Sequence, residues 1–240
     1  MDDVPKAIAF YQALFGWDIE LGGPEVGGYS IAHSGGRIVA AVSPKMGAPG
    51  APSAWTTYLA TDDVDATAAT IKGAGGQLLA EPMDVMEEGR MAVAMDPAGA
   101  VFGLWQGGNT TGLGVANEPG ALVWNEQLSR DFAGSQAFYQ AVFGYGYQDM
   151  SGDGFKYAML MVDGHEVGGM GEYPDGTPAQ MPGAAWATYF AVTDTDAAVA
   201  KVSELGGRVV QPPSDTPYGR IGVVADSDGA VFSVITPPAS

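Results

Sequence analysis

The sequence predicts an α+β fold of two tandem modules, each made of paired βαβββ units. The first observation is a repeat: residues 7–17 and 135–145 share Phe-Tyr-Gln-Ala-x-Phe-Gly at an offset of 128 residues, from Phe10 to Phe138. Two further blocks recur at offsets of 131 and 130 residues, Trp55–Tyr58 as Trp186–Tyr189 and Asp96–Phe102 as Asp226–Phe232. A repeat this long indicates a duplicated domain rather than a solenoid, whose repeats span about 20–50 residues.

Length, charge and cysteine content narrow the class of protein. The chain has 240 residues, enough for two domains of about 100–150 residues. Its formal net charge of −18 argues against nucleic acid or an anionic membrane as a partner, because both attract clustered Lys and Arg. The absence of Cys excludes disulfides and thiolate chemistry. We therefore expect a soluble, cytoplasmic monomer or homodimer.

The first half of the chain begins with a predicted helix over 4–15. Apolar residues from Ala7 to Leu14 recur at helical spacing, Pro5 suits the first turn, and Gly16 suits the helix end. Short alternating segments bounded by glycine pairs then predict strands over 17–21, 29–33 and 37–42, and a Pro/Gly-rich linker follows over 44–53.

The same order of elements continues to the middle of the chain. A strand over 54–61 leads through acidic residues, which suit a helix N-terminus, into a helix over 63–74. Further strands are predicted over 77–82, 91–95 and 101–105, the last two joined by the turn sequence Asp96-Pro-Ala-Gly. We place the first module at 1–106, a linker at 107–119 and the second module at 120–240.

The second half repeats this series with one additional strand. Its predicted elements are strand 121–128, helix 132–143, strands 145–149, 155–162 and 165–171, linker 173–183, strand 185–192, helix 194–205, and strands 208–212, 221–225 and 231–235. The first module lacks a counterpart of strand 121–128. Either the chain is truncated, its start is misassigned, or another segment takes that place, because a missing strand leaves neighbouring backbone groups without partners.

The βαβββ order, the Phe-Tyr-x-x-x-Phe-Gly-Trp/Tyr helix ends and the Asp-Pro-x-Gly hairpin resemble the vicinal oxygen chelate superfamily. That superfamily includes glyoxalase I, extradiol dioxygenases and bleomycin-resistance proteins. The tandem order, with Trp124-Asn-Glu opening the second module, is similar to actinobacterial two-module proteins labelled glyoxalase-like or hydroxylase. The resemblance implies βαβββ units that curl into a cup, but it leaves the chemistry open because one fold carries many functions.

The resemblance also implies where a divalent metal would be held. The ligand positions of the superfamily fall on Trp124 in the first strand, on Thr56 and Ala187 in the fifth, and on Gly103 and Ser233 in the eighth. None of these is an imidazole or carboxylate donor, of which a catalytic metal typically needs three. We expect a metal-free pocket. The alternative is a non-standard divalent site from Glu126, His165, Glu166 and Glu172.

Strand alternation predicts which side chains line the cup. The candidates for ligand binding are Trp124, Glu126, Thr56, Tyr58, Tyr189, Trp105 and Ser233. Arg90 and Arg220, which occupy matching places in the two modules, are further candidates that could bind a ligand carboxylate. Mostly apolar walls with few polar groups are typical of small-molecule pockets. Glu126 is the candidate catalytic residue, since a desolvated carboxylate can act as an acid or base.

Three functions compete at this stage. The leading hypothesis is a protein that binds a small aromatic or apolar molecule without metal, as the resemblance to bleomycin-resistance proteins implies. The second is a metal-dependent lyase, isomerase or dioxygenase. The third is a metal-free enzyme, such as a hydroxylase, with Glu126 as general base. Each candidate residue also has a purely structural interpretation. Trp124 and Trp105 could fill the barrel interior, Glu126 could be an exposed or Arg-paired carboxylate, and the two arginines could be solvated surface charges.

Overall fold

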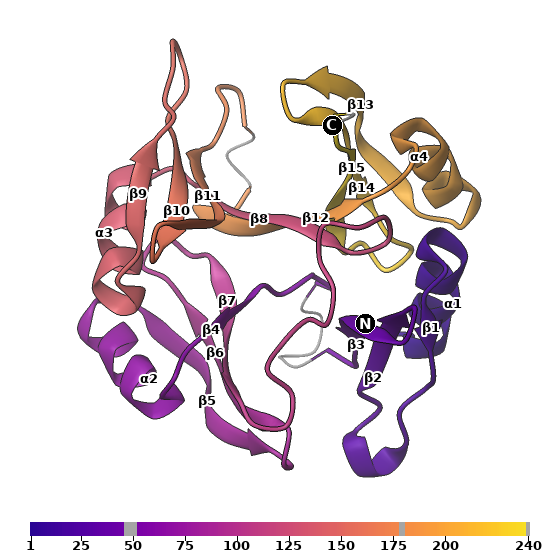
Figure 1. The fold of residues 1–240 in the computed structure, drawn as a ribbon, viewed down its shortest axis with the longest axis horizontal. Helices are drawn as coiled ribbons and strands as arrows, with labels where there is room; N and C mark the ends of the chain where they lie inside the picture. The colour runs from indigo at the N-terminus through magenta and orange to yellow at the C-terminus, as the bar shows by residue number, and fades with distance from the viewer. Residues whose placement is uncertain (46–51, 178–180, 239–240) are drawn as a thin grey trace. The chain divides into compact units, whose positions relative to one another are not determined.

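The computed structural model describes residues 1–45, 52–177 and 181–238, and it confirms the α+β fold. The chain forms two compact units (Figure 1). Unit 1 contains residues 1–55, 113–123 and 188–240, and unit 2 contains residues 56–112 and 124–187. Each unit therefore takes one βαβββ series from each half of the sequence. The module boundaries along the chain remain a prediction.

Unit 1 combines the first and the last βαβββ series of the chain. Its helices are α1 (Val4–Phe15) and α4 (Thr195–Glu204), with a short 3₁₀ helix η1 (Pro24–Val26). Its strands are β1 (Asp18–Ile19), β2 (Ser30–Ser34), β3 (Arg37–Val42), β12 (Ala184–Ala191, from Thr188 onward), β13 (Arg208–Thr216), β14 (Gly219–Ala225) and β15 (Val231–Thr236). The strand orders are β1-β2-β3 and β13-β14-β15-β12.

Unit 2 contains the two middle series. Its helices are α2 (Val64–Gly73) and α3 (Phe132–Phe143). Its strands are β4 (Tyr58–Ala60), β5 (Gln77–Val85), β6 (Gly89–Met95), β7 (Val101–Gly107), β8 (Leu122–Ser129, from Trp124 onward), β9 (Gly146–Asp149), β10 (Tyr157–Val162) and β11 (His165–Glu172). The strand orders are β4-β7-β6-β5 and β8-β11-β10-β9, and in each series the first strand runs parallel to the last.

Capping residues mark both ends of α1 and α3, and Gly16 ends α1 as predicted. The side chain of Asp131 accepts the N–H of Gly134 at the start of α3, and Asp3 caps α1 in the same way. Gly16 and Gly144 end these helices in the left-handed conformation that glycine adopts without strain. The predicted helices 4–15 and 132–143 are thereby confirmed.

Some predicted segments differ from the structure. The strand predicted over 54–61 was too long, because only Tyr58–Ala60 pairs, with Gly103–Trp105 of β7. The side chain of Trp55 turns instead toward Tyr11, to which its indole N–H donates. Parts of the two predicted Pro/Gly-rich linkers, residues 46–51 and 178–180, lie outside the described residues.

The outer edge of β3 is the place where a first strand would run in this series. Three series have such a parallel first strand, β4 beside β7, β8 beside β11 and β12 beside β15. At β3 the segment after β7 approaches instead: the Gly114 N–H donates to the Ile38 carbonyl at 2.8 Å. Arg37 also forms an ion pair with Glu118 at 2.6 Å. Linker residues thus cover part of this edge.

Two equivalent hydrogen-bond networks join the sequence halves inside the units. In unit 1 the buried hydroxyl of Tyr11 donates to Asp226 at 2.7 Å and accepts from the Trp55 indole at 3.1 Å. In unit 2 the hydroxyl of Tyr139 donates to Asp96 at 3.1 Å and accepts from the Trp186 indole at 2.8 Å. The carboxylates are buried but satisfied, since each also accepts backbone N–H groups of its own hairpin turn.

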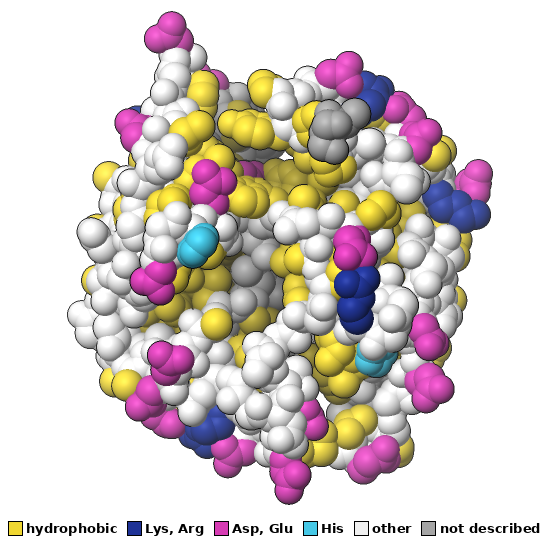
Figure 2. Space-filling model, in the orientation of Figure 1, with side chains coloured by type: hydrophobic (Ala, Val, Ile, Leu, Met, Phe, Trp, Pro, Cys, Tyr) yellow, Lys and Arg dark blue, Asp and Glu magenta, His cyan; other side chains and the backbone are white. Residues whose placement is uncertain are grey.

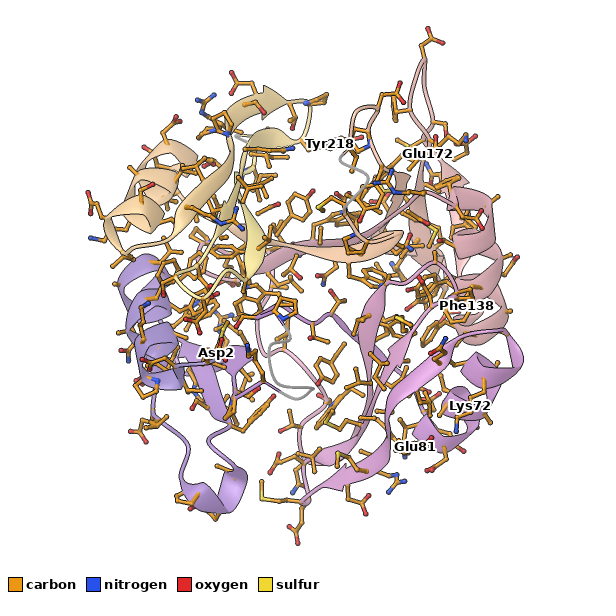
Figure 3. The ribbon with its side chains drawn as sticks, turned by 180° about the vertical axis from the view of Figure 1, so that it is seen from behind. Asp2, Lys72, Glu81, Phe138, Glu172 and Tyr218 are labelled. Atoms are coloured by element: carbon orange, nitrogen blue, oxygen red, sulfur yellow. The ribbon has the colours of Figure 1, made fainter. Side chains whose placement is uncertain are left out.

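Apolar cores and an acidic surface complete the two units. Tyr11, Phe190 and Phe232 lie in the core of unit 1, and Phe102 and Phe138 in that of unit 2. Ion pairs lie at the surface, as Lys72 of α2 does with Glu81 of β5 (Figure 3). Acidic side chains are spread widely over the visible face, with few basic ones among them (Figure 2). Within the described ranges, the helices are too short and too polar to cross a membrane.

Candidate functional site

Three side chains linked by hydrogen bonds lie on a half-buried face of unit 2. The indole N–H of Trp124 donates to the hydroxyl of Tyr157 at 3.0 Å, and this hydroxyl donates to a carboxylate oxygen of Glu126 at 2.9 Å. Trp124 and Glu126 alternate on one face of β8, while the intervening positions of the strand, Gln127 among them, turn toward the core. The structure thus links two predicted site residues, Trp124 and Glu126, through Tyr157, which was not predicted.

Two glycines create the space for Tyr157. Gly169 and Gly171 lie on β11, between β8 and β10, and Gly169 is the direct neighbour of Glu126. A Cβ atom on Gly169 would overlap the Tyr157 hydroxyl, and one on Gly171 would lie 3.0 Å from its ring. The missing side chains therefore let the tyrosine ring lie flat across β11 and reach both Trp124 and Glu126.

Tyr58 and Trp105 share one face of the other sheet of unit 2. The Thr57 hydroxyl donates to the Asn125 side-chain oxygen at 3.1 Å, which brings β4 and β8 together. The next residues, Tyr58 and Glu126, alternate away from that contact. The ring of Tyr58 covers Gly103 of β7 and is 41% exposed, so it is open to a ligand.

The remaining predicted positions of this unit have distinct surroundings. Trp105 lies two residues beyond Gly103 on the same strand, and its indole N–H donates to the Thr110 carbonyl at 2.8 Å. Thr56 is exposed just before β4. We call the surface formed by Trp124, Tyr157, Glu126, Tyr58 and Trp105 the β8 face.

Arg90 and Arg220 are held by acidic residues of their own units. Arg90 forms ion pairs with Asp84 and Asp65, and Arg220 with Asp215 and Asp196. Hydrogen bonds to Asp84 and Asp196, respectively, raise the pKa of the two guanidinium groups. Asp65 and Asp196 belong to the first turns of α2 and α4, so the arginines tie strands to helices. Their charge is already matched, and the β8 face does not include them.

The predicted positions Tyr189 and Ser233 of the last series belong to unit 1. Tyr189 of β12 is the direct neighbour of Ser233 of β15, as Tyr58 is of Gly103 in unit 2. Ser233 is buried, with 3% of its surface exposed. Tyr189 and Ser233 thus repeat in unit 1 the strand pairing that Tyr58 and Gly103 make in unit 2.

The residues at the superfamily's metal positions do not fit a divalent cation. Trp124, Thr56 and Ser233 supply no imidazole or carboxylate. The alternative donors also lie apart: Glu172 pairs with Lys156 at 2.8 Å, and His165 and Glu166 are exposed at the start of β11. Within the described ranges, no three His, Cys, Asp or Glu residues are grouped to hold a metal.

Comparisons with known proteins agree with this architecture. The model of the Glyoxalase/Bleomycin resistance protein/Dioxygenase superfamily matches residues 1–104 and 122–234. The chain belongs to this superfamily. A Mycobacterium tuberculosis protein with the provisional name glyoxylase CFP32 is 42% identical over 98% of this chain and 91% of its own length. The anthracycline biosynthesis protein DnrV of Streptomyces peucetius is 38% identical over 97% of this chain and 89% of its own.

Solved structures show the same fold at low sequence identity. The Mn(II)-bound glyoxalase from Novosphingobium aromaticivorans matches with a TM-score of 0.60 and 16% identity, covering 98% of this chain and 78% of that one. The halotolerant catechol dioxygenase BphC matches with a TM-score of 0.61 and 14% identity, covering 98% and 83%. At these identities the likeness concerns the fold alone.

Proposed function

We propose that the protein binds a flat, largely apolar organic molecule on the β8 face of unit 2. The observation that carries this proposal is the Tyr157 hydroxyl, which joins Trp124 and Glu126 on a half-buried surface. The hydrogen bonds orient the indole and phenol rings before a ligand arrives, and preorganisation lowers the entropy lost on binding. Aromatic surface with few placed polar groups suits a planar ligand.

The relatives support this class of ligand. DnrV takes its name from anthracycline biosynthesis, and anthracyclines carry a planar fused-ring core. A carboxylate at Glu126 next to a tyrosine hydroxyl suits a ligand that presents a hydroxyl group at the edge of its ring system, because a carboxylate is a strong hydrogen-bond acceptor. The function that we propose is therefore the binding of such molecules without a metal ion.

Isothermal titration calorimetry with a hydroxylated anthraquinone tests this function. We expect saturable binding that weakens roughly tenfold in Trp124→Ala, because an aromatic pair contributes about 0.5–1.5 kcal/mol beyond the apolar area that it buries. Phe155→Ala is the matched control, since Phe155 is an exposed aromatic of unit 2 outside the β8 face. Equal affinity in Trp124→Ala and the unmodified protein would refute the proposed face.

A second candidate function is a metal-free enzyme with Glu126 as general base. The hydrogen bond from Tyr157 favours it, since it fixes the carboxylate in one orientation. Glu126→Gln keeps the shape of the side chain and removes its basicity. Under this hypothesis a bound substrate is no longer turned over by Glu126→Gln although it still binds. Unchanged turnover in Glu126→Gln excludes the role.

A further inference from the structure

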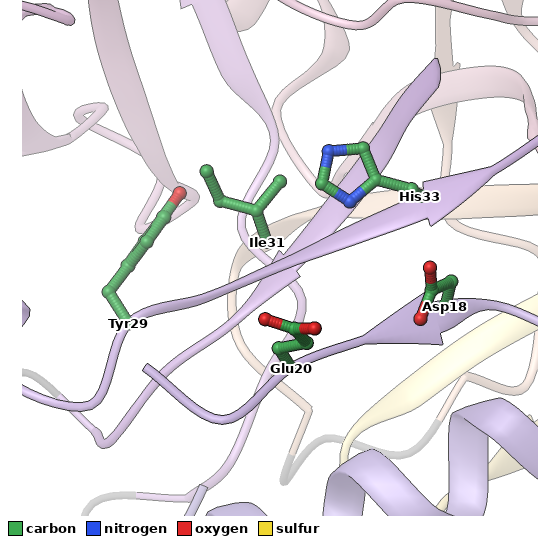
Figure 4. A pocket seen from close by; sticks show the side chains of 5 residues that line it. All are labelled: Asp18, Glu20, Tyr29, Ile31 and His33. Carbon is green, nitrogen blue, oxygen red and sulfur yellow. The ribbon is translucent and has the colours of Figure 1, made fainter. Parts of the chain in front are cut away.

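Unit 1 contains a cavity of about 430 Å³ lined by Asp18, Glu20, Tyr29, Ile31 and His33 (Figure 4). Its volume lies within the range of about 300–1,000 Å³ typical of small-molecule sites. In Figure 4 the carboxylate of Glu20 lies toward Tyr29 and Ile31, while Asp18 lies toward His33. The cavity belongs wholly to unit 1 and is separate from the β8 face.

The strand register explains why these five side chains share one surface. Asp18 of β1 is the direct neighbour of His33 on the antiparallel strand β2. Alternation along each strand places Glu20 on the side of Asp18, and Tyr29 and Ile31 on the side of His33. The intervening residues Ile19, Ser30 and Ala32 are buried on the opposite side.

Tyr29 is the counterpart of Tyr157 at the repeat offset of 128 residues, yet it stands differently. Tyr157 lies flat because Gly169 and Gly171 leave room on the neighbouring strand. The counterparts of these glycines in unit 1 are Ala41 and Ser43, as the matching pairs Met159–Gly169 and Ile31–Ala41 show. Ala41 and Ser43 carry Cβ atoms at the two positions that the glycines leave free in unit 2. Tyr29 is 49% exposed and forms a wall of the cavity.

The carboxylates of Asp18 and Glu20 are not paired with a lysine or arginine in the part of the chain that the structure describes. The same part of the chain has no three His, Cys, Asp or Glu residues grouped for a metal ion, although His33 faces Asp18. Two unpaired carboxylates beside an aromatic ring and an aliphatic side chain instead match an organic cation with an apolar part.

We infer that this cavity binds a small organic ammonium compound, with its charged group between Asp18 and Glu20 and its apolar part against Tyr29 and Ile31. The face of the tyrosine ring attracts a cation through its quadrupole, and the carboxylates accept the ammonium N–H groups. The site is independent of the proposed function, because none of its residues belongs to the β8 face.

Titration of the full chain with phenethylamine tests the inference, with 2-phenylethanol as the neutral probe of the same shape. Calorimetry gives the affinity, and the imidazole NMR signals give the location, because the chain has two His residues and His33 alone lines the cavity. We expect saturable amine binding that shifts the signals of His33 and leaves those of His165 in place. The alcohol should bind at least about tenfold more weakly, since it lacks the charge.

Two double variants distinguish specific binding in the cavity from a general attraction of the amine to an acidic protein. Asp18→Asn with Glu20→Gln should weaken amine binding roughly fivefold to tenfold. Asp153→Asn with Asp175→Asn removes the same charge from exposed positions in unit 2 and should leave the affinity unchanged. Absence of saturable binding, equal losses in both double variants, or equal shifts at both histidines would each overturn the inference.

Discussion

The hydroxyl of Tyr11 donates a 2.7 Å hydrogen bond to Asp226, which lies 215 residues further along the chain. The bond fastens α1 of the first sequence half to the turn between β14 and β15 of the second. Because the same carboxylate also accepts the N–H groups of Asp228 and Ala230, it holds its own turn and the helix at once. Tyr139 and Asp96 repeat this arrangement in unit 2.

Removing the Tyr11 hydroxyl should destabilise the protein. Tyr11→Phe leaves the buried Asp226 carboxylate and the Trp55 indole each without one partner, so we expect the free energy of unfolding to fall by about 1.5–3 kcal/mol. Urea unfolding followed by circular dichroism measures this change. Tyr218→Phe alters an exposed tyrosine and should stay within about 0.5 kcal/mol of the unmodified protein. Similar midpoints for both variants would show that the bond contributes little.

Alkaline pH should destabilise the protein through its buried tyrosines. Burial raises the pKa of Tyr145 to about 12 and, together with Asp226, raises the pKa of Tyr11 well above its ordinary value. Below pH 10 these phenols are neutral in both the folded and the unfolded chain, so their stabilising effect is complete. Between pH 10 and the folded pKa only the unfolded chain ionises, and stability falls.

Each such tyrosine should lower the free energy of unfolding by at most about 1.4 kcal/mol per pH unit in that window. Urea unfolding at pH 9, 10 and 11 measures the slope. Tyr145→Phe should make the slope shallower, because one ionising group is removed from the unfolded chain. A stability that stays constant from pH 9 to 11 contradicts this account.

Gly169→Ala should displace Tyr157 and disrupt the β8 face. The added methyl group would overlap the tyrosine hydroxyl, so the ring must leave its place between Trp124 and Glu126. We expect a loss of about 1–3 kcal/mol in stability and a change in Trp fluorescence. Gly73→Ala is the control, because that position at the end of α2 has open space around it and alanine favours helix. If the two alanine variants behave alike, Tyr157 is not held as described.

Gly114→Ala should loosen the linker from β3. A Cβ atom there would lie 3.0 Å from the backbone nitrogen of Ile38, which cannot move without disturbing the strand. We expect faster hydrogen exchange at the amide of residue 114, because its bond to the Ile38 carbonyl weakens. Slow exchange that persists in the variant would show that the edge tolerates the methyl group. The amide of Gly103, which donates to the Thr57 carbonyl in unit 2, should be unaffected.

The elements of the fold could be predicted largely from local signals. Helix 132–143 was predicted to the residue from the repeat of helix 4–15, and in the structure Asp131 caps its start and Gly144 ends it. Strand 54–61 was overextended because β-branched and aromatic residues suggested a ladder, whereas Trp55 is committed to a hydrogen bond with Tyr11. Pairing across the two halves depends on contacts between distant segments, which periodicity within one segment does not reveal.

The candidate site was predictable only in part. Strand alternation placed Trp124 and Glu126 on one face, but it missed Tyr157, whose position depends on two glycines of a neighbouring strand. Alternate glycines at 169 and 171, following an aromatic residue near the start of the preceding strand, were the available signal. The acidic partners of Arg90 and Arg220 were also available from the repeat, since Asp65 and Asp84 recur as Asp196 and Asp215.

The division of the chain between its units has a consequence for biosynthesis. Unit 1 needs both α1, near the start of the sequence, and β15, near its end, whereas unit 2 is built from residues 56–112 and 124–187. A chain emerging from the ribosome from its N-terminus can therefore complete unit 2 while α1 still awaits its partner strands. During translation the apolar side of α1 therefore stays exposed longest, and a chaperone would be needed to cover it.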